Sequence, residues 1–302
     1  MSNYQGWLNI YKPLGISSFS VVRKIKKQFN LSKIGHGGTL DPLAEGVLPI
    51  AIGKATKLIT FINSNIKEYE FEIKWGEETT THDAEGEVID RSDNIPTFED
   101  IKNGLTEFKG TVLQKPPKAS AIKINGKRAY QLFREKKYFE IKAKSVIIHE
   151  AKILSSTNNL ITKIKIKCGK GFYVRSFARD IAEKLNTKAY IYSLKRTKVG
   201  KFDIQNANLL DDLIKIRQRL TEFRGFHTSV SMLDDILAYE IDDEKNKLCI
   251  SQGKSININV NQLNNPSLNS SDRKIIFLTD KGKVISFGKL NGDLFKPEKV
   301  LI

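Results

Sequence analysis

The stretch GHGGTLDPLAEG, residues 35–46, decides how this chain is interpreted. Glycines flank His36 on both sides, and the loop ends in the pair Asp41-Pro42. An apolar run, residues 47–52, follows at once and predicts a buried strand. An aspartate before a proline often serves only to form a turn, and glycines often serve only the backbone geometry. The other interpretation is that the loop presents a single carboxylate for chemistry.

The composition points to an anionic partner. The 302 residues include 50 Lys and Arg against 34 Asp and Glu, which gives a formal net charge of +16. Such an excess favours a polyanionic partner, most often nucleic acid. The same chain is rich in Lys, Asn and Ile, a composition that an AT-rich genome also produces. The charge alone therefore favours an anionic partner without establishing one.

The cysteines and the apolar segments indicate in which cellular compartment the protein is expected. Cys168 and Cys249 lie far apart and outside any Cys-x-x-Cys spacing, so they predict neither a disulfide scaffold nor a zinc site. The first residues contain no basic region followed by an apolar one, and no apolar run approaches the ~18 residues of a membrane span. We therefore expect a cytoplasmic protein without a membrane segment.

The hydrophobic patterns predict an α+β fold with a mixed, mainly antiparallel sheet and flanking helices. A first helix is expected after a cap at Ser17 or Ser18. Further helices are expected at residues 54–64, 97–110 and 172–186, and strands at residues 47–53, 67–76 and 161–171. In the last of these strands isoleucines alternate with lysines, and the cationic face is either a solvated edge or a surface for RNA.

The composition changes after about residue 225. Short strands, a polar loop and hairpin signals at residues 280–283 and 291–293 predict a small β-rich module. We expect a larger domain over residues 1–228 and this module over residues 229–302.

Several common kinds of active site are excluded. Six residues separate Gly46 from Gly53, and Ala55 stands where a phosphate-binding loop needs a hydroxyl. The four histidines do not have the spacing of metal ligands, and neither a Gly-x-Ser-x-Gly nor a Gly-x-Gly-x-x-Gly motif is found. The chemistry that remains is one that requires no metal and no cofactor.

The order of the motifs resembles one family. The segments NIYKPLGISS, GHGGTLDPLAEGVLPIAIGKATK, KEYEF, PPKASAIKINGKRAYQLFRE and CGKGFYVRSFARDIAEKL follow one another as in the bacterial tRNA pseudouridine-55 synthases, the TruB family. The resemblance covers about residues 7–205, and its Gly-His-x-Gly-x-Leu-Asp-Pro motif is highly specific. Gly38 and Ala119 depart from the family pattern, since many members have another small residue and a tyrosine at these positions.

The resemblance also implies roles for individual residues. Asp41 would be the nucleophilic carboxylate, Tyr69 would lie against the target uracil, and Arg175 would pair with Asp41. The residues that would bind the substrate are His36, Tyr173, Leu194 and Lys12. Residues 115–145 would form a flexible basic arm over the RNA, and residues 229–302 would resemble a PUA-type RNA-binding module.

The implied activity is the isomerisation of uridine 55 in the T loop of tRNA to pseudouridine, on a base flipped out of its stack. The reaction breaks the N1–C1′ bond, turns the base and joins C5 to C1′. The carboxylate attacks C1′ or C6, or removes a proton at C2′ on the way to a glycal, and these routes stay open. The loop glycines would let RNA approach the backbone closely. We expect the T arm of tRNA as partner, and a monomer.

Two other functions are compatible with the same segments. One is a guide-dependent rRNA pseudouridine synthase that shares the core. The other is a non-catalytic RNA-binding or chaperone protein, although binding alone does not require the carboxylate. A tRNA-folding activity is also expected as a secondary role of the enzyme.

Overall fold

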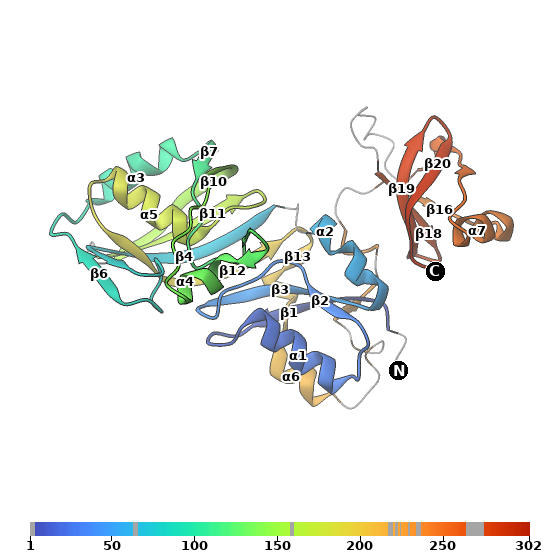
Figure 1. Ribbon diagram of the computed structural model, residues 1–302, viewed down its shortest axis with the longest axis horizontal. Coiled ribbons are helices and arrows are strands. Elements are labelled where there is room, and N and C mark those ends of the chain that lie inside the picture. Colours follow the sequence, from blue (N-terminus) through green and yellow to red (C-terminus); the bar gives the residue numbers. More distant parts are fainter. Residues whose placement is uncertain are drawn as a thin grey trace.

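Two β-sheets organise the chain (Figure 1). The computed structural model describes residues 4–62, 66–157, 160–216, 220, 223, 225–228, 230–233, 237–263 and 275–302. Within these residues, no helix has both the length and the apolar character needed to cross a membrane.

The larger sheet has 11 strands, and its main path runs β14-β1-β3-β12-β4-β11-β10-β7, with β2, β13 and β15 attached at its sides. Its strands are β1 (Gly6–Lys12), β2 (Ile34–His36), β3 (Ala44–Ile52), β4 (Lys67–Trp75), β7 (Gly110–Gln114), β10 (Lys144–Thr157), β11 (Ile161–Cys168), β12 (Ala189–Val199), β13 (Phe202–Asp203), β14 (Asn208–Leu209) and β15 (Phe226–His227). The pairs β1–β14 and β3–β12 are parallel, and the others are antiparallel. The predicted mixed, mainly antiparallel sheet is therefore confirmed.

Helices cover this sheet in two separate places. The helices are α1 (Ser18–Gln28), α3 (Phe98–Glu107), α5 (Val174–Lys184) and α6 (Leu210–Lys215), with a short 3-10 helix η2 (Ile204–Asn206) before β14. Apolar residues of α1 and α6 share one core with one face of β1 and β3. Those of α3 and α5 share another core with β4, β10, β11 and β12. Figure 1 shows these two helices beside that part of the sheet.

Local sequence signals account for most of these elements. Ser17 caps α1, because its side chain accepts a hydrogen bond from the backbone N–H of Ser20 at 3.1 Å. Strands β4 and β11 alternate between buried and less buried residues along their length, as their sequences predict. The helix predicted over residues 54–64 is instead a 3-10 helix, η1 (Gly53–Leu58), followed by a single α-turn, α2 (Ile59–Ile62). Residues 63 and 64 lie outside the described residues.

A sharp turn of the chain at the end of β3 explains why a 3-10 helix stands where an α-helix was predicted. Gly53 has a φ of 62°, and a Cβ there would lie 2.3 Å from the carbonyl oxygen of Tyr4. The chain therefore turns sharply before the predicted helix begins.

Two hairpins project from the larger sheet. One pairs β5 (Glu77–Thr79) with β6 (Val88–Arg91), and the other pairs β8 (Lys123–Ile124) with β9 (Lys127–Arg128), which leads into α4 (Ala129–Arg134). The second hairpin and α4 lie in the predicted arm, residues 115–145. The arm has a small core of its own around Ala129, Phe139 and Ile141.

The second sheet has five strands in the order β16-β18-β19-β20-β17. Its elements are β16 (Leu237–Glu240), α7 (Glu244–Ser251), β17 (Ile256–Asn257), the 3-10 helix η4 (Val260–Gln262), β18 (Ile275–Asp280), β19 (Lys283–Asn291) and β20 (Leu294–Val300). A β-rich C-terminal unit with hairpins at the predicted positions is thus present.

Aromatic rings join the two sheets. The ring of Phe61 in α2 lies 4.8 Å from that of Phe277 and 5.1 Å from that of Phe287, both edge to face. These rings belong to one apolar cluster that also contains Trp7 and Val47 of the larger sheet. The C-terminal sheet is therefore held by packing against η1 and α2.

We predict that Phe61→Ala lowers the free energy of unfolding by about 2 kcal/mol, because it removes the ring that contacts both Phe277 and Phe287 and leaves a cavity in its place. Urea denaturation followed by circular dichroism measures the change. Phe19→Ala is the matched control, since Phe19 is 69% exposed and its loss is expected to change stability by less than ~0.5 kcal/mol. Equal effects of the two variants would contradict the interface.

Candidate active site

The loop that carries Asp41 is fixed by contacts from strand β3 and helix α1. It connects β2 to β3, and the Gly37 N–H donates to the carbonyl of Pro49 at 2.8 Å. The hydroxyl of Ser18 in α1 donates to the Leu40 carbonyl at 2.9 Å and accepts from the Leu40 N–H at 2.8 Å. The backbone just before Asp41 is therefore held by one buried side chain.

Lys12 and Arg196 hold the loop from below. The Lys12 ammonium donates to the carbonyls of Pro13, Ile16 and Pro42 at 2.9, 2.6 and 3.4 Å. Its side chain is fully buried, and burial lowers the pKa of Lys12 to about 8 against the opposing charge of Asp41. Lys12 thus lies beneath the loop and positions it.

Arg196 was not predicted as a site residue. Its Nη2 donates to the Gly38 carbonyl at 3.0 Å and its Nε to the Val47 carbonyl at 2.8 Å. The side chain is buried, at 1% exposure.

The loop glycines pack against protein. Gly46 has a φ of 103°, and a Cβ there would lie 2.2 Å from the carbonyl oxygen of Arg196. A Cβ on Gly37 would lie 3.0 Å from Ile62. The expectation that these glycines leave room for RNA is therefore wrong for both positions, because neighbouring strands and helices already fill that room.

Asp41 forms an ion pair with Arg175 at the start of α5. The distance from Asp41 Oδ2 to Arg175 Nη2 is 2.9 Å, and the carboxylate side chain is 39% exposed whereas the guanidinium side chain is 7% exposed. The same guanidinium donates to the carbonyls of Thr81 and Ala119 at 3.2 and 3.0 Å. A buried cation therefore meets a carboxylate that is open to solvent.

Asp83 is a second carboxylate at this guanidinium, and the sequence analysis missed it. Its Oδ2 lies 3.4 Å from Arg175 Nη1, and its Oδ1 accepts hydrogen bonds from the Thr81 hydroxyl at 2.5 Å and the Glu85 N–H at 3.1 Å. Burial raises the pKa of Asp83, and Arg175 opposes that shift. The only signal in the sequence was the turn-forming stretch TTTHDAEG.

Tyr69 and Leu194 lie next to this ion pair. They come from adjacent strands, β4 and β12, where Tyr69 is opposite Arg196 and Leu194 is opposite Phe71. Both are nearly buried and share a core with Leu40 and Ala44 on either side of Asp41. Burial raises the pKa of Tyr69, so this residue is a neutral phenol at pH 7.

Tyr173 immediately precedes α5. Its backbone N–H and carbonyl are both paired with the side chain of Gln114, at 2.8 and 3.1 Å. Burial and the nearby Asp41 charge raise the pKa of Tyr173. The structure therefore brings together Asp41, Arg175, Tyr69, Leu194 and Tyr173.

His36 lies at the other end of the loop, at the end of β2. Burial and the Arg196 charge lower its pKa, so the imidazole is neutral at pH 7. Its predicted stacking within an RNA loop stays a prediction.

The root of the arm, residues 115–119, is hydrogen-bonded to α5, the helix that carries Arg175. The carbonyl of Lys115 accepts from the Ser176 hydroxyl at 2.8 Å and from Arg179 Nη2 at 2.9 Å. Four residues further on, Ala119 supplies the carbonyl that holds Arg175. The prolines between them restrict the backbone of this segment.

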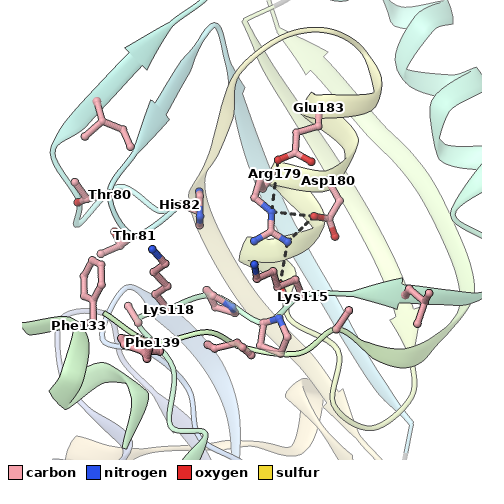
Figure 2. Close-up of a pocket in the computed structure, with 17 residues that line it drawn as sticks. Thr80, Thr81, His82, Lys115, Lys118, Phe133, Phe139, Arg179, Asp180 and Glu183 are labelled. Carbon is pink, nitrogen blue, oxygen red and sulfur yellow. Dashed lines mark hydrogen bonds and ion pairs between the residues drawn. The ribbon is translucent and has the colours of Figure 1, made fainter. Parts of the chain in front are cut away.

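A cavity of about 650 Å³ separates the arm from α5 and the β5–β6 hairpin (Figure 2). Figure 2 shows Arg179 paired with Asp180 and Glu183 on the wall formed by α5. Lys118, Phe133 and Phe139 of the arm line the other side. Asp41 does not line this cavity.

The lysines of β11 are partly neutralised. Lys163 and Lys165 lie 3.7 and 3.1 Å from Glu70 and Glu68 of the adjacent strand β4. The predicted cationic face is thus a ladder of opposite charges, which weakens its case as a phosphate-binding surface.

In the part of the chain that the structure describes, no three His, Cys, Asp or Glu side chains gather as a metal site would require.

The profile of TruB family pseudouridylate synthases (N terminal domain) matches residues 26–174. This match, with a carboxylate loop beside a buried arginine on a mixed sheet, defines the class as pseudouridine synthase. The tRNA pseudouridine synthase B of Caulobacter sp. (strain K31) is 40% identical over 251 residues, 83% of this chain and 81% of that protein. The one of Agrobacterium fabrum is 36% identical over 98% of this chain and 94% of that protein. The chain belongs to the TruB family.

The fold is also found in solved structures. A crystal structure of a Cbf5-Nop10-Gar1 complex contains a chain that matches 98% of this one and 85% of itself, with a TM-score of 0.73 and 22% identity. This likeness concerns the fold alone. The higher identity to bacterial tRNA enzymes favours the tRNA synthase over the guide-dependent alternative.

We predict that Ser18→Ala destabilises the protein by about 2 kcal/mol, because it leaves the buried Leu40 N–H and carbonyl without their partner. Because the loop then loses its hold on Asp41, we also expect turnover to fall more than RNA affinity. Thermal or urea unfolding and single-turnover assays measure the two effects. Ser145→Ala, at an exposed position of β10, is the control; a loss of the same size there would argue against the Leu40 contacts.

Proposed function

We propose that this protein is a tRNA pseudouridine synthase that isomerises uridine 55 in the T loop, with Asp41 as the catalytic carboxylate. The observation that carries the proposal is the 2.9 Å ion pair between partly exposed Asp41 and buried Arg175 in a member of the TruB family. Tyr69, Tyr173 and Leu194 lie beside this pair. Lys12 lies beneath the loop, and His36 lies at its other end.

The geometry suits a reaction that needs one carboxylate. No water has to be activated, in contrast to ordinary glycoside hydrolysis, where two carboxylates share the work. When RNA covers the site, the Asp41 carboxylate loses contact with water, and the guanidinium of Arg175 remains as its partner. Asp83 in turn balances the charge of Arg175, so one cation serves two carboxylates.

Recognition would require the target base to leave its stack. Flipping costs a few kcal/mol, and stacking on aromatic side chains recovers ~1–3 kcal/mol per base. Tyr69 and Tyr173 would supply such contacts, and Leu194 would form an apolar wall. Exposed lysines and arginines of α1 would contact phosphates, which makes the affinity dependent on salt.

The remaining assignments complete the proposal. Residues 115–145 act as the RNA-covering arm, residues 1–228 form the catalytic domain, and residues 229–302 act as a PUA-like RNA-binding module. The enzyme works as a monomer on the T arm of tRNA.

The activity is tested by tritium release from tRNA labelled at uridine C5, because joining C5 to C1′ expels that hydrogen. We expect release by the wild type and none by Asp41→Asn, with tRNA binding retained by both. Tight binding without release by the wild type would instead indicate an RNA-binding protein, and Asp41 would be only a turn residue.

Arg175→Lys tests the ion pair. Lysine keeps the charge but cannot hold Asp41, Asp83 and two carbonyls at once, so we expect single-turnover rates to fall about 100-fold. RNA affinity, measured by filter binding, is expected to change less than about threefold. Arg91→Lys is the control and should keep the wild-type rate, because the Arg91 side chain in β6 is 72% exposed. Unchanged turnover in Arg175→Lys would count against the pairing.

A further inference from the structure

Gln114 is a buried glutamine whose side-chain amide pairs with the backbone of Tyr173. It is the last residue of β7 and is 2% exposed. Its Oε1 accepts from the Tyr173 N–H at 2.8 Å, and its Nε2 donates to the Tyr173 carbonyl at 3.1 Å. One amide therefore holds both backbone groups of the residue that precedes α5.

Tyr173 occupies a position where the backbone needs support from another segment. It is the N-cap of α5, with an extended backbone at φ −119° and ψ 116°. Ser17 and Thr97 cap α1 and α3 with their own side chains, whereas tyrosine is not a capping residue. Two extended residues in a sheet exchange an N–H and a carbonyl bond in the way that Gln114 and Tyr173 do. The amide of Gln114 thus takes the place of a neighbouring strand and fixes the conformation of Tyr173.

The backbone conformation of Tyr173 decides where its phenol points. Fixed φ and ψ angles set the direction of the Cα–Cβ bond, and only a few rotamers remain for the side chain. Burial and the Asp41 charge raise the pKa of Tyr173, and the Arg175 charge opposes them. Because both charges act on it, the phenol lies close to the ion pair that carries the proposed reaction.

The segment that follows Gln114 reaches the phenol itself. Ser120 is 4% exposed, and against the larger effect of burial its hydroxyl lowers the pKa of the Tyr173 phenol. Among the described residues, the Ser120 Oγ has no partner in hydrogen-bond geometry, so this contact is weaker than the two made by Gln114. Residues 114–120 therefore approach Tyr173 both at its backbone and at its ring.

We propose that Gln114 is a positioning residue for the proposed reaction. Its amide fixes the Tyr173 backbone and so directs the phenol toward the nucleotide held at Asp41. The inference rests on the proposed function, and it adds a residue that acts on the nucleotide only through Tyr173. A displacement of about 1 Å in an active site can cost about 100-fold in rate, so such a residue affects turnover without touching RNA.

The test is a double-mutant cycle between Gln114 and Tyr173. Gln114→Met keeps the length of the side chain but can bond neither backbone group of Tyr173. Tyr173→Ala removes the ring that Gln114 directs. Single-turnover tritium release from T-arm RNA labelled at uridine C5 gives the rate, and filter binding gives the RNA affinity. Gln205→Met, at an exposed position of η2, is the control.

We expect Gln114→Met to be about tenfold slower than the wild type, with RNA affinity within about threefold. We expect Tyr173→Ala to be at least about tenfold slower. In the Tyr173→Ala background, Gln114→Met should slow the reaction less than about twofold, because no ring is left to direct. Gln205→Met should keep the wild-type rate.

An equal slowing by Gln114→Met in both backgrounds overturns the inference, as does a wild-type rate in Gln114→Met or in Tyr173→Ala. Gln114→Glu, which has the same size but no amide donor for the Tyr173 carbonyl, completes the same cycle if Gln114→Met does not fold. A wild type that releases no tritium would instead refute the proposed function. The two failures are therefore distinguishable.

Discussion

The site depends on one buried guanidinium. Arg175 binds Asp41 from the β2–β3 loop, Asp83 and the Thr81 carbonyl from the turn after β5, and the Ala119 carbonyl from the root of the arm. A buried cation must have its donors satisfied by the protein, because water no longer does so. These three segments, which are distant in sequence, are therefore fixed relative to one another by a single side chain.

The sequence reveals residues whose chemistry is local. Asp41 stands in a specific motif, and β4 and β11 alternate regularly, so both could be predicted without a structure. Asp83 could not, because its stretch is an ordinary turn and its role arises only where that turn meets Arg175. The prediction of an α-helix after residue 53 was wrong for a similar reason. The turn there is forced by the close approach of Tyr4 to Gly53, a contact between distant parts of the sequence.

Lysines are the residues that sequence patterns misjudge most. Composition and alternation treat every lysine as a surface charge, yet Lys12 and Lys67 are buried, and Lys163 and Lys165 are paired with glutamates. The net charge of +16 therefore overstates what an RNA backbone would meet on this sheet. Salt-dependent affinity would have to come from the exposed cations of α1 and of the arm instead.

Two of the side chains that fix the Asp41 loop are cations buried beneath it. Ser18, Lys12 and Arg196 hold the loop through backbone groups, so the carboxylate reaches its position without further ordering when RNA binds. Two of these three anchors also bring positive charge under the site. Lys12 donates to three carbonyls and Arg196 to two, whereas the single hydroxyl of Ser18 serves only the two backbone groups of Leu40. The extra donors of the two cations hold backbone groups from separate segments at once, which offsets part of their desolvation cost.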